Sequence, residues 1–154
     1  MKINELNQTS GIDKNLKLVE RYLQFEKLLV ELRKRELPVG LVVSINRDIE
    51  DLNSISGSGD ELRKVIRKKQ TRIIKLLEKE LKLVPKNYYR NLWLVVGMAG
   101  FGIPIGVALG ASQGNMANFG LGFPIGLAIG IAVGSGMDKK AFKEGRQIDL
   151  EIKC

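Results

Sequence analysis

The feature that most constrains this chain is a long stretch without charged residues, from Leu92 to Met137, that carries two runs of regularly spaced glycines. Each run, which we call a glycine ladder, has a glycine at every fourth position: Gly102, Gly106, Gly110 and Gly114 in the first, Gly122, Gly126, Gly130 and Gly134 in the second. The surrounding residues repeat too, because Gly-Ile-Pro-Ile-Gly-Val-Ala-Leu-Gly from position 102 returns as Gly-Phe-Pro-Ile-Gly-Leu-Ala-Ile-Gly from position 122. The repeat predicts two similar elements joined by a short connection.

In water these glycines would argue against a helix, since each costs about 1 kcal/mol relative to alanine. In a bilayer the backbone must satisfy its own hydrogen bonds, and glycine lets two helices approach closely. The predicted spans, 92–111 and 119–137, are each about 30 Å long as helices, which matches the hydrocarbon core of a membrane. The polar, uncharged segment 112–118 between them is prone to turn. We therefore expect a transmembrane helical hairpin over residues 85–137.

The hairpin would fold about Asn118, which would place Gly102 opposite Gly134 and Gly106 opposite Gly130. Two arrangements are open. The ladders can pack on each other inside one hairpin, or they can pack between subunits and build an oligomer.

Pro104 and Pro124 occupy equivalent positions in the two copies of the repeat. Each lacks a backbone N–H group, so each is expected to bend its helix. A kink near the start of a helix and a functional gate are both open interpretations of these residues.

The two ladders and the Asp138-Lys139-Lys140 sequence that follows them resemble the glycine-zipper hairpins of small, mostly uncharacterised bacterial membrane proteins. The resemblance covers about residues 92–140. It implies a close-packed and often oligomeric hairpin, and also membrane permeabilisation. It assigns no role to residues 1–91.

Charge is placed unevenly around the hairpin, and it predicts the topology. Lys and Arg number nine against nine acidic residues in 1–59, eleven against four in 60–90, and five against four in 91–154. Both flanks of the hairpin are basic and its loop is uncharged, so the positive-inside rule places both termini in the cytoplasm. We expect the membrane to be a bacterial inner membrane.

Residues expected at the membrane interface, by their aromatic or basic character, are Lys86, Tyr88, Tyr89, Arg90, Trp93, Lys139 and Lys140.

The part of the sequence before the hairpin predicts a flexible arm at 1–11 and a cytoplasmic three-helix domain over 12–84. After the hairpin we expect a cytoplasmic tail at 138–154. Apolar spacing indicates helices at about 12–36, 41–55 and 60–84. In the first, a heptad-like stripe of Leu18, Tyr22, Phe25, Leu29 and Leu32 is widened by Leu16, Val19, Leu23 and Leu28. This stripe can form the core of the domain or pair with another copy of the chain.

The third helix is strongly basic, and three interpretations of its charge are open. They are a solvated face, a surface for anionic lipid headgroups, and contact with nucleic-acid phosphates. The nucleic-acid interpretation is the weakest, because no aromatic residues are interleaved with the basic ones. The candidate residues for anionic lipid are Arg63, Lys64, Arg67, Lys68, Lys69, Arg72 and Lys75.

The composition argues against catalysis. The chain has no histidine, and its one cysteine is Cys154, so the usual general base and metal ligands are missing and no cofactor is expected. We therefore expect an all-α, non-enzymatic membrane protein whose hairpin anchors or assembles the helical domain and self-associates. An oligomeric pore gated by that domain is the alternative, and the polar groups that would line it cluster at Ser112, Gln113 and Asn115.

Overall fold

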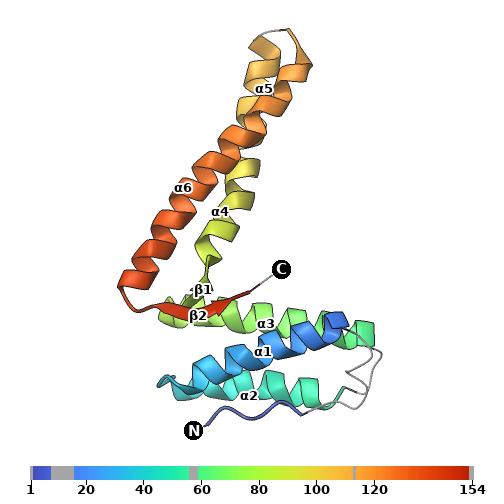
Figure 1. Ribbon diagram of the computed structural model, residues 1–154, viewed down its shortest axis with the longest axis vertical. Helices are drawn as coiled ribbons and strands as arrows, with labels where there is room; N and C mark the ends of the chain where they lie inside the picture. Colours follow the sequence, from blue (N-terminus) through green and yellow to red (C-terminus); the bar gives the residue numbers. More distant parts are fainter. Residues whose placement is uncertain (1, 8–15, 56–58, 113, 153–154) are drawn as a thin grey trace. The chain divides into compact units, whose positions relative to one another are not determined.

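The computed structural model describes residues 2–7, 16–55, 59–112 and 114–152, and the chain divides into two compact units. The first unit comprises residues 1–83 together with 148–152, and the second is centred on residues 84–147. The elements are labelled in Figure 1.

The first unit is built from three helices, α1 (Leu16–Arg33), α2 (Val39–Asn53) and α3 (Gly59–Leu81). The five residues of the expected stripe on α1 are all buried, as are Leu28 and the apolar face of α2. Leu16 and Leu23 are exposed, so the buried face of α1 is narrower than the sequence suggested. These large side chains form a conventional hydrophobic core, which burial of apolar surface stabilises.

The amino-terminal segment differs from the expected flexible arm. Residues 2–7 run alongside the helices, and Ile3 is buried. The Asn4 backbone N–H donates to Asn46 Oδ1 at 2.8 Å, and the Tyr22 hydroxyl donates to the Asn7 carbonyl at 2.8 Å. Side-chain amides and a phenol satisfy this backbone, which composition alone does not reveal. Residues 8–11 of the expected arm lie outside the described residues.

The third helix ends three residues before the position expected. Lys82 adopts a left-handed conformation, with φ 54°, and this terminates α3 at Leu81. A short strand follows, β1 (Val84–Lys86), and it pairs with β2 (Gln147–Glu151) in a two-stranded sheet. The fold is therefore mostly helical, in agreement with the expected all-α class, and it adds one small two-stranded sheet that the sequence did not predict.

The second unit is a helical hairpin of two long arms. The first arm comprises α4 (Tyr88–Gly97), one π-helical turn (Met98–Gly102) and α5 (Ile103–Ser112). The second comprises a 3-10 turn (Met116–Leu121) and α6 (Gly122–Lys143). In Figure 1, α6 runs beside α4 and α5. Both arms are longer than the predicted spans, at 25 and 28 residues.

The segment after the second span was expected to be a polar tail. Its first part continues α6 to Lys143, where Gly145, with φ 69°, ends the helix. The Gly145 N–H donates to the Phe142 carbonyl and the Arg146 N–H to the Ala141 carbonyl, the pattern of a Schellman cap. The chain then enters β2, and Ile148 is fully buried.

Candidate membrane hairpin and basic surface

The hairpin is closed by eight buried glycines, which we call the glycine seam: Gly97, Gly102, Gly106 and Gly110 on the first arm, and Gly122, Gly126, Gly130 and Gly134 on the second. The backbones of the arms nearly touch along it. A methyl group built on Gly126 would lie 2.6 Å from the Gly102 nitrogen and 2.6 Å from the Gly97 carbonyl oxygen. Real side chains do not approach backbone this closely, so glycine is required for this packing.

The register of the seam differs from the predicted one. Gly102 lies against Gly122 and Gly126 rather than Gly134, and Gly134 lies against Arg90. The partner of Gly102 is thus displaced by 8 to 12 residues (134 minus 126 or 122). The cause is the position of the reversal. The chain turns at Gly114, with φ 62°, and not at Asn118, so residues 116–121 already belong to the second arm.

Two glycines exchange roles relative to the prediction. Gly114, expected in the first ladder, is an exposed turn residue with nothing near its missing side chain. Gly97, which the ladder did not include, packs against Gly126 and Gly130. Gly97 was missed because it lies five residues before Gly102, whereas the ladder was defined by a spacing of four. A π-helical turn inserts one extra residue, so positions five apart across that turn can share a face that elsewhere repeats every four.

The two prolines have different settings despite their equivalent places in the repeat. Pro104 is the second residue of α5, two positions after the π-helical turn that interrupts the first arm ends at Gly102. Pro124 lies in the first turn of α6, directly after the 3-10 turn that ends at Leu121. The first proline thus accompanies a helix irregularity and the second a helix start.

The aromatic and basic residues predicted at the interface are not all on the surface. Tyr89 is buried with Val84 and Ala141, and Tyr88 and Trp93 pack against this cluster. The remaining four are Lys86, Lys139 and Lys140, which are exposed, and Arg90, which is half-buried. This cluster holds the two arms together at the open end of the hairpin. Of the three aromatic residues expected at the membrane interface, Tyr89 is buried, and only Tyr88 and Trp93 remain half-exposed.

Asp138 has a role that the sequence did not indicate. It is 7% exposed, and its carboxylate accepts hydrogen bonds from the Tyr89 N–H at 3.1 Å and the Arg90 N–H at 2.9 Å. These are backbone donors in the first turn of α4, where a helix has no internal acceptors and favours negative charge. Asn87, the residue before α4, makes no side-chain cap. Asp138 of the second arm therefore caps the first arm.

The outer faces of both arms are apolar and exposed. In each arm only 17% of the most apolar window is buried. Exposed side chains from both arms include Val95, Phe101, Val107, Ile125, Ile131 and Val133. An apolar surface of this extent marks contact with lipid or with another protein.

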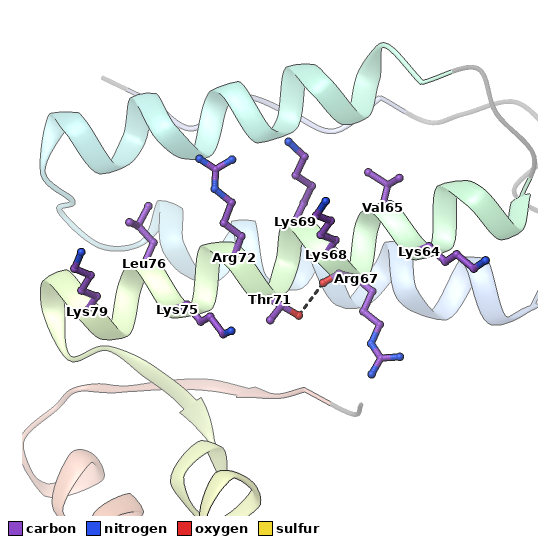
Figure 2. Close-up of a pocket in the computed structure, with 10 residues that line it drawn as sticks. All are labelled: Lys64, Val65, Arg67, Lys68, Lys69, Thr71, Arg72, Lys75, Leu76 and Lys79. Atoms are coloured by element: carbon purple, nitrogen blue, oxygen red, sulfur yellow. Dashed lines mark hydrogen bonds between the residues drawn. The ribbon is translucent and has the colours of Figure 1, made fainter.

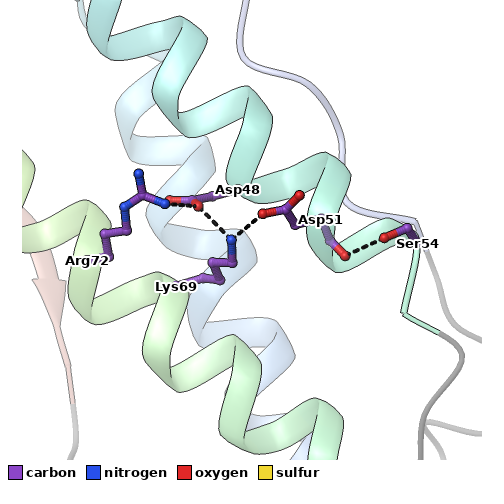
Figure 3. A network of polar contacts seen from close by, with 5 residues as sticks. All are labelled: Asp48, Asp51, Ser54, Lys69 and Arg72. Atoms are coloured by element: carbon purple, nitrogen blue, oxygen red, sulfur yellow. Dashed lines mark hydrogen bonds and ion pairs between the residues drawn. The ribbon is translucent and has the colours of Figure 1, made fainter.

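The basic residues of α3 divide into paired and unpaired groups. Asp48 of α2 is 3% exposed and accepts from Lys69 Nζ at 2.8 Å and Arg72 Nη1 at 2.7 Å. Lys69 also contacts Asp51 at 2.5 Å (Figure 3). Arg63 lies 3.4 Å from Asp60, one turn earlier on its own helix. Three of the seven lipid candidates are therefore engaged inside the unit, two of them in a link between α2 and α3.

This network changes the pKa of two of its members, Asp51 and Lys69. The hydrogen bond from Lys69, together with its charge, lowers the pKa of Asp51 from its ordinary 3.8. Burial disfavours the charged form of Lys69, but the hydrogen bonds to Asp48 and Asp51 outweigh it and raise the Lys69 pKa above 10.5. Both groups are therefore charged near neutral pH, which keeps the link between the helices intact.

Five basic residues of α3 make no ion pair within the described part of the chain: Lys64, Arg67, Lys68, Lys75 and Lys79. They line a shallow groove of about 920 Å³ with the half-buried Val65 and Leu76. In Figure 2, Lys69 and Arg72 reach toward α2, whereas Arg67 and Lys75 point away from it. Lys79 was not among the predicted lipid candidates, although its spacing of four from Lys75 would have included it.

No family model, curated protein or solved structure matches this chain.

Proposed function

We propose that this chain is a non-enzymatic membrane anchor, in which a helical hairpin inserts into a bilayer and holds the three-helix unit at its surface. The observation that carries the proposal is the hairpin itself. Its two arms are 25 and 28 residues long, and 17% of each apolar window is buried. Helices at the core of a water-soluble protein would be largely covered, whereas lipid is the natural environment for exposed apolar faces on arms of this length.

The glycine seam supports an anchor rather than a pore built on the ladders. All eight seam glycines are buried by contacts within a single chain. The seam glycines that a zipper between subunits would use are thus in contact within one hairpin. We assign the seam to closing the hairpin, and we expect the particle in mild detergent to have the mass of one chain.

Chain connectivity supports one side of the membrane for everything outside the hairpin. The first unit contains residues that precede the first arm and residues 148–152 that follow the second. Both connections must therefore leave the bilayer on the same face. The basic flanks and the uncharged loop support the cytoplasm as this face.

Thiol labelling tests insertion and orientation together. A cysteine introduced at Asn115, in the loop, should react with a membrane-impermeant thiol reagent in intact cells, whereas the native Cys154 should react only after lysis. Labelling of Cys154 in intact cells would reverse the orientation. Release of the chain by alkaline carbonate would overturn the membrane anchor itself.

A further inference from the structure

The unpaired basic residues of α3 form a continuous stripe on one side of the helix. Lys64, Lys68, Lys75 and Lys79 are separated by four, seven and four residues, spacings that recur on one face of an α-helix. From the first to the last of them the helix rises about 22 Å. We call these four lysines with Arg67 the basic stripe.

We propose that the basic stripe binds the anionic lipid headgroups of the bilayer into which the hairpin inserts, an inference that rests on the proposed function. Five positive charges along one straight helix are complementary to a flat anionic surface. Each such residue gains from the surface potential of anionic lipid when it lies within a Debye length.

The ion pairs between α2 and α3 distinguish the basic residues that stabilise the unit from those proposed to bind lipid. Lys69 and Arg72 lie in the same basic segment, but Asp48 and Asp51 already neutralise them. The stripe cations have no such partner among the described residues, so their charge remains available. The proposal therefore predicts different consequences for neighbouring basic residues on one helix.

The position of α3 in the chain favours lipid over other polyanions. Leu81, its last residue, is seven residues from Tyr88, where the first membrane arm begins. A chain of that length spans at most about 25 Å, so the stripe is tethered close to the headgroups. Nucleic-acid grooves usually add aromatic side chains on which bases stack, and the ten residues that line this groove include none.

The test uses the full-length protein in lipid nanodiscs, because Ile148 belongs to the first unit and a fragment ending before it would be incomplete. One set of discs contains phosphatidylcholine, and the other contains equal parts of phosphatidylcholine and phosphatidylglycerol. An amine-acylating reagent is added, and the modification rate of each lysine is read by peptide mass spectrometry. Lys17 and Lys27, which are exposed on α1, are the internal controls.

In anionic discs the stripe lysines should be modified about threefold more slowly than in neutral discs, and high salt should remove the difference. Lys17 and Lys27 should react equally in both. The double variant Lys68→Gln/Lys75→Gln should reduce the protection of Lys64 and Lys79. Its charge-matched control, Lys17→Gln/Lys27→Gln, should leave that protection unchanged.

Equal rates for the stripe in both kinds of disc would overturn the proposal, as would equal protection of Lys17 and Lys27. Protection by an added RNA oligonucleotide in neutral discs, with none from phosphatidylglycerol, would reassign the stripe to nucleic acid. Incorporation of the chain into discs is measured separately by co-migration. A chain that does not incorporate would refute the anchor, and the stripe would then be judged by the same footprint with phosphatidylglycerol vesicles added to the free chain.

Discussion

The two units of this protein reach close packing by opposite means. In the three-helix unit, large side chains such as Phe25, Leu29 and Ile49 are fully buried and fill the space between helices. In the hairpin, the buried positions are glycines, and the backbones themselves are in contact. The hydrophobic effect in water drives the first kind of packing. It is absent between helices in lipid, where close contact between helix backbones stabilises packing instead. The first unit should thus be sensitive to losing atoms, and the second to gaining them.

The largest effect is expected from removing core atoms in the first unit. Phe25→Ala should lower its stability by about 3–5 kcal/mol, because a fully buried ring is lost and a cavity remains. The control Leu23→Ala alters an exposed residue of the same helix and should change little. Hydrogen exchange of α1 amides measures both. Equal protection of α1 in the two variants would contradict a core centred on Phe25.

The next effect is the converse change in the hairpin. Gly126→Ala adds one methyl group against the backbone of Gly97 and Gly102, and should destabilise the hairpin by about 1–3 kcal/mol. Gly136→Ala, on the same helix with open space around it, should be neutral or slightly stabilising. Thermal unfolding in detergent, followed by the fluorescence of Trp93, distinguishes the two. Equal unfolding temperatures for the two variants would contradict direct contact between the arms along the glycine seam.

A smaller loss is expected when the cap between the arms is removed. Asp138→Ala leaves two backbone N–H groups of α4 without their acceptor and should cost about 1–2 kcal/mol. Lys139→Ala changes an exposed neighbour and serves as the control. If the two variants unfold at the same temperature, Asp138 does not hold the arms together.

The smallest effect concerns pH in the first unit. The folded pKa of Asp51 is lowered by Lys69, so its stabilising contribution is present above the unfolded value of 3.8 and is lost as pH falls through the folded value. Lys69→Met should therefore return the Asp51 pKa toward 3.8 and flatten the acid limb of the stability profile. NMR titration of the Asp51 carboxyl carbon measures this shift. An unchanged Asp51 pKa in the variant would exclude the contact.

How far the sequence predicts this structure depends on whether a feature is carried by side-chain pattern or by backbone position. The apolar spacing of α1 and α2 predicted their buried faces, and the uncharged stretch predicted two long apolar helices. The predicted register of the hairpin was wrong because it depends on one left-handed turn residue, Gly114, and the asparagines nearby also tolerate that conformation. One shift of the turn moves every partner along the seam.

Two features that the sequence did not predict are a contact to backbone atoms and a very short strand. Asp138 accepts from backbone N–H groups, which every residue carries, so no complementary side chain marks them. The strand β1 has three residues and includes Pro85, too short for any alternation to show. Asp48 did leave a signal. It lies among Ile45, Ile49 and Leu52 on the apolar face of α2, where an acidic residue requires a cationic partner.

The return of the chain to its first unit has a consequence for synthesis. Ile148 is fully buried, and with residues 149–152 it belongs to a unit whose remaining residues end at Leu83. After Leu83 the ribosome must add 65 residues to reach and include Ile148 (148 minus 83), and these contain both arms of the hairpin. At about 5–20 residues per second this takes roughly 3 to 13 s. Protease sensitivity of α1–α3 in chains stalled before and after residue 148 would show whether the unit waits for its last strand. A domain that can be completed only after both arms have been synthesised couples its own maturation to the synthesis of the hairpin.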